Sequence, residues 1–182
     1  MQELANHGWD FLMWIEQWGL STWIREGNIL TDQQVLSAYY VMLAFHGIGM
    51  AIIVGVTFFL TARVFGLGAN IPLEAAAGLL KLGWAGFFIN LVSGLLLLIA
   101  QPLREIYTAA YDVKMVMVIA ACITMSMLGR ALTSIELMPG IGGTMIEVVP
   151  QRARVIALTT TVFWLMAVAA GRLIGYTEPP PM

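Results

Sequence analysis

Residues 41–60 read VMLAFHGIGMAIIVGVTFFL, and this stretch decides the fold. It is long enough to cross a bilayer, whose hydrocarbon core takes about 20 apolar residues of α-helix. His46 is its only ionisable side chain. Such a side chain is costly at membrane depth, so it usually faces a protein interior and marks a functional site. We therefore centre the search for chemistry on His46.

Three similar apolar stretches follow the first one. The chain of 182 residues is 59% hydrophobic and 11% charged, whereas soluble domains carry about 25% charged residues. The sequence predicts an all-α, polytopic membrane protein, a bundle of four transmembrane helices that contacts the lipid bilayer. We expect the spans at residues 32–63, 73–100, 109–132 and 154–176, with a capping box of Thr31 and Gln34 before the first.

The segment before the first span has a different composition. Residues 1–30 contain four tryptophans among acidic residues: Trp9, Trp14, Trp18 and Trp23. Tryptophan prefers the boundary between membrane and water. We therefore divide the chain into an amphipathic interfacial segment, residues 1–30, and a transmembrane domain, residues 31–182. Gly19 is expected to break the interfacial segment, and Ser21 to cap a second short helix.

Two other segments lack the pattern of a span. Residues 133–151 contain several glycines and prolines and are expected to form a structured loop. The proline-rich tail, residues 178–182, is expected to be extended. We see no basic stretch leading into an apolar core, so no cleavable signal peptide is expected.

The charged residues predict an orientation. The two loops opposite the termini, with nearby helix ends, hold five basic residues: Arg63, Lys81, Arg130, Arg152 and Arg154. The side of the termini holds four: Arg25, Arg104, Lys114 and Arg172. Basic residues favour the cytoplasmic side. The pattern predicts that both termini lie outside the cytoplasm.

Composition also excludes several classes of function. The net charge of −2 provides no basic footprint for nucleic acid. With Cys122 as the one cysteine, neither an internal disulfide nor a cysteine-based zinc site is possible. Walker, HExxH and GxSxG motifs are absent. His7 is the only other histidine, so a haem at His46 would need another ligand type or a ligand from a partner.

Met42 and Met50 lie four residues to either side of His46, on one helix face. Histidine and thioether together can ligate haem iron or soft copper. Methionine is also a common filler of apolar cores, and this chain has 12. Packing is the more common role of such residues, and copper handling is the alternative.

Polar residues elsewhere are candidates for a shared site with His46. Asn90 is expected at a similar depth in the second span, where it would orient the imidazole or form a plain interhelical hydrogen bond. Lys81 and Lys114 are candidates for pairing with an acidic ligand group, such as a propionate or a phospholipid. Arg63 stands at the end of its span, where snorkelling to the interface is the usual behaviour.

Small residues suggest close helix contacts. Gly47, Ala51 and Gly55 share one face of the first span, and Ala167, Gly171 and Gly175 repeat every four residues in the fourth. The second set predicts a homo-oligomer or a larger membrane complex. Packing within the chain's own bundle is the alternative.

Five runs of sequence resemble, in the same order, an uncharacterised family of four-helix bacterial inner-membrane proteins. They read WIEQWGLSTWIREGNIL (14–30), FHGIGMAIIVG (45–55), ARVFGLG (62–68), SGLLLLIAQP (93–102) and YDVKMVMVIA (111–120). The family often has an acidic residue where this chain has Thr61.

More distantly, the layout is similar to HemJ-type protoporphyrinogen oxidases and to copper-resistance D-type membrane domains. The former have a histidine in the first span, an arginine at its end and a tryptophan-x-x-lysine in a later span. His46, Arg63 and Lys114 stand in those places, with Tyr111 where the tryptophan would be. The resemblance implies haem b bound at His46.

Three functions therefore stay open. The first is a haem-b protein that exchanges electrons with a quinone or a redox protein, with propionates or a small anion held by Lys114, Arg63 or Lys81. The second is a non-enzymatic accessory subunit, or a homo-oligomeric membrane protein, with a structural His46. The third is copper handling. Whether the protein is an enzyme is left open.

Overall fold

A computed structural model describes residues 2–27, 37–106, 108–133, 137–139 and 145–176. Four helical stretches are long and apolar enough to cross a membrane: Ala38–Val64, Leu73–Ala100, Ala109–Thr133 and Gln151–Ile174. The predicted class, an all-α bundle of four membrane-spanning helices, is confirmed.

The first two spans differ in detail from the sequence prediction. Helix α3 (Ala38–Val64) begins later than expected, where the hydroxyl of Ser37 accepts a hydrogen bond from the amide of Tyr39 at 3.3 Å. The capping box of Thr31 and Gln34 falls outside the described residues. The second span is two helices, α4 (Leu73–Gly78) and α5 (Leu80–Ala100), which meet at Leu79.

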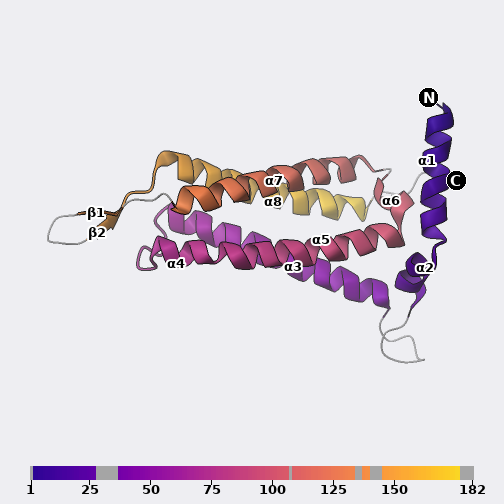
Figure 1. Cartoon of the computed structure of the whole chain (residues 1–182), viewed down its shortest axis with the longest axis horizontal. Helices are drawn as coiled ribbons and strands as arrows, with labels where there is room; N and C mark the ends of the chain where they lie inside the picture. Colours follow the sequence, from indigo (N-terminus) through magenta and orange to yellow (C-terminus); the bar gives the residue numbers. More distant parts are fainter. Residues whose placement is uncertain (1, 28–36, 107, 134–136, 140–144, 177–182) are drawn as a thin grey trace.

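The four spans are arranged as two closely packed pairs (Figure 1). Helix α3 packs along α5, α7 (Ala109–Thr133) packs along α8 (Gln151–Ile174), and contacts between α3 and α8 join the pairs. Among the described residues, α5 and α7 share few contacts. The bundle is therefore loosest between α5 and α7.

The core lies where the two pairs meet. Its largest fully buried side chains include Ile53, Leu60, Met125, Leu128 and Trp164. The indole N–H of Trp164 has no hydrogen-bond partner among the described residues, and its ring lies against Phe87 with centroids 6.2 Å apart. Unpaired buried donors are uncommon because each costs about 1–3 kcal/mol.

The close contact between α3 and α5 is made by a residue outside the predicted small-residue face. A Cβ added to Gly49 would lie 2.7 Å from the backbone nitrogen of Asn90 and from the carbonyl oxygen of Gly86. Gly47, Ala51 and Gly55 are instead exposed, and a Cβ at either of these two glycines would meet no atom within 4 Å. The two helix backbones therefore approach most closely at Gly49.

The N-terminal segment crosses one end of the bundle (Figure 1). Helices α1 (Gln2–Glu16) and α2 (Gly19–Glu26) meet at Gln17 and Trp18, just before the glycine expected to break the segment. Ser21 does not cap α2. It is fully buried, and its hydroxyl donates to the carbonyl of Ala100 at 3.3 Å. The side chain of Arg25 bonds to Glu16 at 3.1 Å and to the same carbonyl at 3.4 Å.

Aromatic side chains of this segment face outward. Phe11, Trp14 and Trp18 form a stack with successive centroids 6.1 and 6.2 Å apart, and all three are exposed. Exposed aromatic rings at the end of a transmembrane bundle suit the interfacial position predicted from the sequence.

The opposite end holds a small β-hairpin that we did not expect. Strands β1 (Leu137–Pro139) and β2 (Met145–Glu147) pair antiparallel beyond the ends of α7 and α8 (Figure 1). The sequence prediction was a structured loop, since these strands are too short for a recognisable alternation. Near the other end, α6 (Pro102–Ile106) is a short helix between α5 and α7. The C-terminal tail falls outside the described residues.

Candidate functional site

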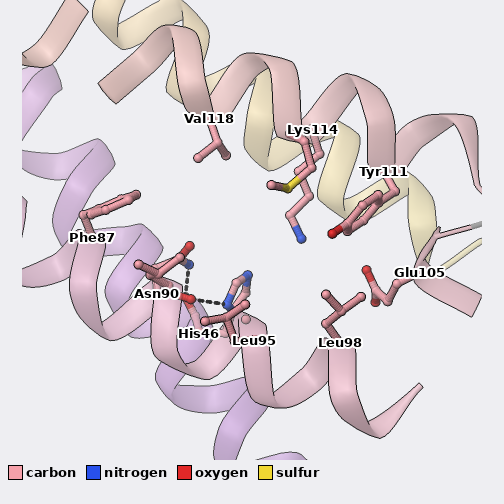
Figure 2. Close-up of a pocket in the computed structure, with 12 residues that line it drawn as sticks. His46, Phe87, Asn90, Leu95, Leu98, Glu105, Tyr111, Lys114 and Val118 are labelled. Carbon is pink, nitrogen blue, oxygen red and sulfur yellow. Dashed lines mark hydrogen bonds between the residues drawn. The ribbon is translucent and has the colours of Figure 1, made fainter. Parts of the chain in front are cut away.

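The loose side of the bundle contains a cleft with a volume of about 100 Å³. Its walls come from α5 and α7, its end from α6, and α3 contributes only His46 (Figure 2). Twelve residues line it: His46, Phe87, Asn90, Leu91, Gly94, Leu95, Leu98, Glu105, Tyr111, Lys114, Met115 and Val118. Four of the six residues proposed from the sequence for cofactor binding are in this set: His46, Asn90, Tyr111 and Lys114.

His46 and Asn90 are joined by a reciprocal pair of hydrogen bonds. The side-chain nitrogen of Asn90 donates to the carbonyl of His46 at 2.9 Å, and Nδ1 of His46 lies 3.1 Å from the carbonyl oxygen of Asn90. A carbonyl can only accept, so this bond places the proton of a neutral imidazole on Nδ1. Nε2 then keeps its lone pair, and Figure 2 shows the ring's other nitrogen turned to the cleft.

This arrangement differs in one respect from the predicted role of Asn90. We expected the Asn90 side chain to orient the imidazole, whereas its backbone carbonyl bonds to the ring. Ser93, one helical turn further, places its hydroxyl 3.3 Å from Nδ1 and donates to the carbonyl of Ile89 at 2.7 Å. The imidazole is thus oriented mainly by acceptors on α5.

Gly94 makes room for the ring. A Cβ added there would lie 3.0 Å from Cε1 and 3.3 Å from Nδ1 of His46. The Cε1–Nδ1 edge of the imidazole therefore lies close to the backbone of α5 at Gly94, and any larger residue at this position would push the ring away. The sequence prediction assigned Gly94 no part in the site.

The outer end of the cleft is polar. Lys114 and Tyr111 come from the first turns of α7, and Glu105 comes from α6. In Figure 2 the Lys114 ammonium points toward His46, the Tyr111 hydroxyl points toward that ammonium, and the Glu105 carboxylate faces the same space from α6. Glu105 was missed by sequence reasoning. Its position between Pro102 and the third span offered a signal, because such a residue must stand at the mouth of the bundle.

The stem of Lys114 crosses α8 at a glycine. A Cβ at Gly171 would lie 3.6 Å from Cδ and Cε of Lys114. One turn earlier, Ala167 is fully buried in the core. Ala167 and Gly171 belong to the small-residue stripe that was predicted to contact another subunit. Both pack within the chain, which was the alternative prediction for this stripe.

Arg63 and Lys81 lie away from the cleft. Arg63 is 17 positions after His46 on α3, or roughly 25 Å along a helix. It is buried rather than snorkelling, and its Nε donates to the carbonyl of Ile71 at 2.6 Å. Lys81 is exposed near the start of α5. Neither can reach a group bound between His46 and Lys114, so the proposal that they hold its propionates is not supported by their positions.

The thioethers proposed as metal ligands do not line the cleft. Met42 and Met50 are half-buried, and Met50 packs against the core. The cleft is lined instead by Met115, one residue after Lys114. The described residues contain no cluster of three or more His, Cys, Asp or Glu side chains suited to a metal ion. His46 is thus the one imidazole of the cleft, with Met115 as a nearby thioether.

The cleft suits one edge of a planar or amphiphilic group better than a fully enclosed ligand. Pockets that enclose a ligand commonly measure about 300–1,000 Å³, against about 100 Å³ here. Its apolar walls lie between helices with few mutual contacts, and its polar groups gather at one end. The donor set would offer one imidazole and one ammonium to such a group, and only one edge of a macrocycle would fit a volume of about 100 Å³.

Comparison of the chain with protein-family models, with curated proteins and with solved structures found no match. The function must therefore be inferred from the cleft and from the membrane-spanning fold.

Proposed function

We propose that this chain is an inner-membrane redox protein that binds haem b in the α5–α7 cleft, with Nε2 of His46 as an axial ligand. One observation carries the proposal. Nδ1 bonds to the carbonyl of Asn90, which leaves the lone pair of Nε2 for a ligand in the cleft. Histidines that ligate metals are commonly oriented in this way, by donating the other ring N–H to a carbonyl or carboxylate.

The remaining cleft residues have roles that suit this group. Lys114 would pair with a propionate at the polar end, and Glu105 with Tyr111 would provide the hydrogen-bonding boundary to water. Leu95, Leu98 and other apolar side chains of the walls would exclude water from the macrocycle. A bound haem would supply one-electron redox chemistry, and the sixth ligand would be Met115 or a residue of a partner protein.

Three further features belong to the proposal. The bacterial inner membrane is implied by the resemblance to the four-helix family, and periplasmic termini are expected from the basic residues of the loops. A quinone or a redox protein is the expected electron partner. The resemblance to HemJ-type proteins supports haem at His46 and Lys114, although the position of Arg63 separates that residue from the site.

Haem content tests the proposal directly. The full chain, purified in mild detergent from haem-replete cells, should contain haem b, measured as its pyridine complex. His46→Ala should lose it, while Met42→Leu, outside the cleft, should keep it. A folded, colourless wild-type preparation would refute the assignment.

The second candidate is an accessory membrane subunit in which His46 is structural. The reciprocal bonds favour it, because they pair Nδ1 of His46 and the side-chain nitrogen of Asn90 without any ligand. In that case the protein is colourless, and His46→Ala lowers only the free energy of unfolding. Copper handling has less support, since Met42 and Met50 lie outside the cleft.

A further inference from the structure

A second pocket lies at the far end of the molecule, between the last turns of α7 and the first turn of α8. Its volume is about 330 Å³, larger than that of the His46 cleft. Arg130 of α7 and Arg152 of α8 line it together with Pro150, and Met127 and Ile156 contribute apolar surface. The pocket thus combines two cations with an apolar floor at the end of the membrane spans.

The charged side chains that line this pocket, Arg130 and Arg152, are both positive. Both arginines are exposed, and neither guanidinium has a hydrogen bond or an ion pair with any described residue. No carboxylate lines the pocket among the described residues. Two guanidinium groups therefore line the pocket, and no described residue of its lining supplies a negative charge to balance them.

The start of α8 adds to this positive field. Pro150 precedes the helix without a side-chain cap, and its first turn has no acidic residue. Among the described residues, the amides of Gln151 and Arg152 have no acceptor. A helix N-terminus carries about half a positive charge, so a cation such as Arg152 is unfavourable there. A bound anion would reverse this cost.

We propose that this pocket binds a phosphate group. Arginine matches phosphate oxygens with two parallel hydrogen bonds, and free amides at a helix N-terminus bind phosphate well. The group comes either from an anionic phospholipid, whose glycerol and first methylenes would cover Ile156 and Met127, or from a soluble phosphate ester. Both sources present the same chemistry to Arg130, Arg152 and the α8 amides.

Native mass spectrometry of the full chain tests the proposal. The probes are phosphatidylglycerol and phosphatidylcholine in mixed micelles, and inorganic phosphate and glycerol 3-phosphate in solution. Loss of one charge-assisted contact should weaken retention about tenfold. We therefore expect this loss for Arg130→Gln and for Arg152→Gln. Arg154→Gln is the matched control, since Arg154 is exposed two residues from Arg152 but does not line the pocket.

Each outcome is decisive. Selective retention of phosphatidylglycerol that depends on Arg130 and Arg152 supports the site with a lipid source. Binding of inorganic phosphate or glycerol 3-phosphate with the same dependence supports it with a soluble source. Equal weakening by Arg154→Gln, or no binding of any of the three anions above that of phosphatidylcholine, overturns it. If a glutamine variant fails to fold, Arg152→Lys replaces it, and this variant should bind more weakly because lysine lacks the paired donors.

Discussion

The side chain and the backbone carbonyl of Asn90 make separate hydrogen bonds to His46, with different effects. The Asn90 amide joins α5 to the carbonyl of His46, whereas the imidazole is held by the Asn90 carbonyl. Replacing the Asn90 side chain should therefore weaken the helix contact without releasing the ring.

Asn90→Leu tests this division. The variant should lower the free energy of unfolding in detergent by about 0.6 kcal/mol, and at most about 1.7, the range for interhelical hydrogen bonds in membranes. Its haem content should equal that of the wild type. Loss of haem without loss of stability would show that the Asn90 side chain itself orients the ring.

Gly94→Ala tests the space beside the imidazole. The added methyl would lie 3.0 Å from Cε1 of His46, so the ring or α5 must shift, at a cost of about 1–3 kcal/mol in unfolding free energy. Haem binding should weaken with it. Gly55→Ala is the control, because a Cβ there meets nothing within 4 Å. Equal stability of the two variants would contradict the packing of His46 on Gly94.

At the scale of the elements, α2 is attached to the end of α5. The last carbonyls of a helix have no partner within it, and that of Ala100 accepts from both Ser21 and Arg25. Arg25 also bonds to the carbonyl of Glu16 at 3.0 Å. These contacts hold the N-terminal segment across the mouth of the bundle, on the side of α6.

Removing them should release the segment alone. Ser21→Ala combined with Arg25→Gln should speed amide hydrogen exchange in residues 2–26 while the exchange of α3, α7 and α8 stays unchanged. Thr22→Ala is the matched control, since its hydroxyl bonds only to the carbonyl of Trp18 within the same segment. Unchanged exchange in the double variant would show that lipid contacts, and not Ala100, hold the segment.

The sequence predicted the spans well because hydropathy and length determine them. The contacts between elements could not be predicted from the sequence in the same way. Nothing in residues 19–26 indicates that Ser21 bonds to Ala100. Gly78 directly precedes the break at Leu79, but glycine is common in membrane helices that continue without a break. The hairpin was missed because its strands have three residues each.

The candidate site was predicted only in part, again because contacts between elements are hard to predict from one sequence. Asn90 was chosen as a polar residue at a depth similar to that of His46, and Lys114 as a candidate for pairing with an acidic ligand group. The structure brings all three residues together. Lys81 was included by charge, and Arg63 by charge and by the HemJ-like layout, although their positions along the helices separate them from His46. Gly94 joins the cleft through tertiary packing, which one sequence does not reveal, whereas the position of Glu105 between Pro102 and the third span was a signal that the prediction did not use.

At the scale of the whole molecule, the two ends differ in character. One end holds α1, α2 and α6 with their exposed tryptophans, and the other holds the hairpin and the arginine pocket. The basic residues favour the second end as cytoplasmic, where anionic phospholipids are also available to the arginines.

Reporter fusions test this orientation. A protein that fluoresces only in the cytoplasm, fused after Met182, should stay dark, because both termini are expected in the periplasm. The same reporter fused after Thr133, at the end of the third span, should fluoresce. The reverse pattern would invert the assigned orientation.

The most direct measurement of the central claim is the absorption spectrum of His46→Gly with and without added imidazole. If Nε2 of His46 ligates haem iron in the α5–α7 cleft, the wild-type Soret band should be lost in the variant. Imidazole, which can enter the space vacated by the side chain, should restore it. A Soret band that is unchanged in His46→Gly, or absent from the folded wild-type protein, would contradict the account.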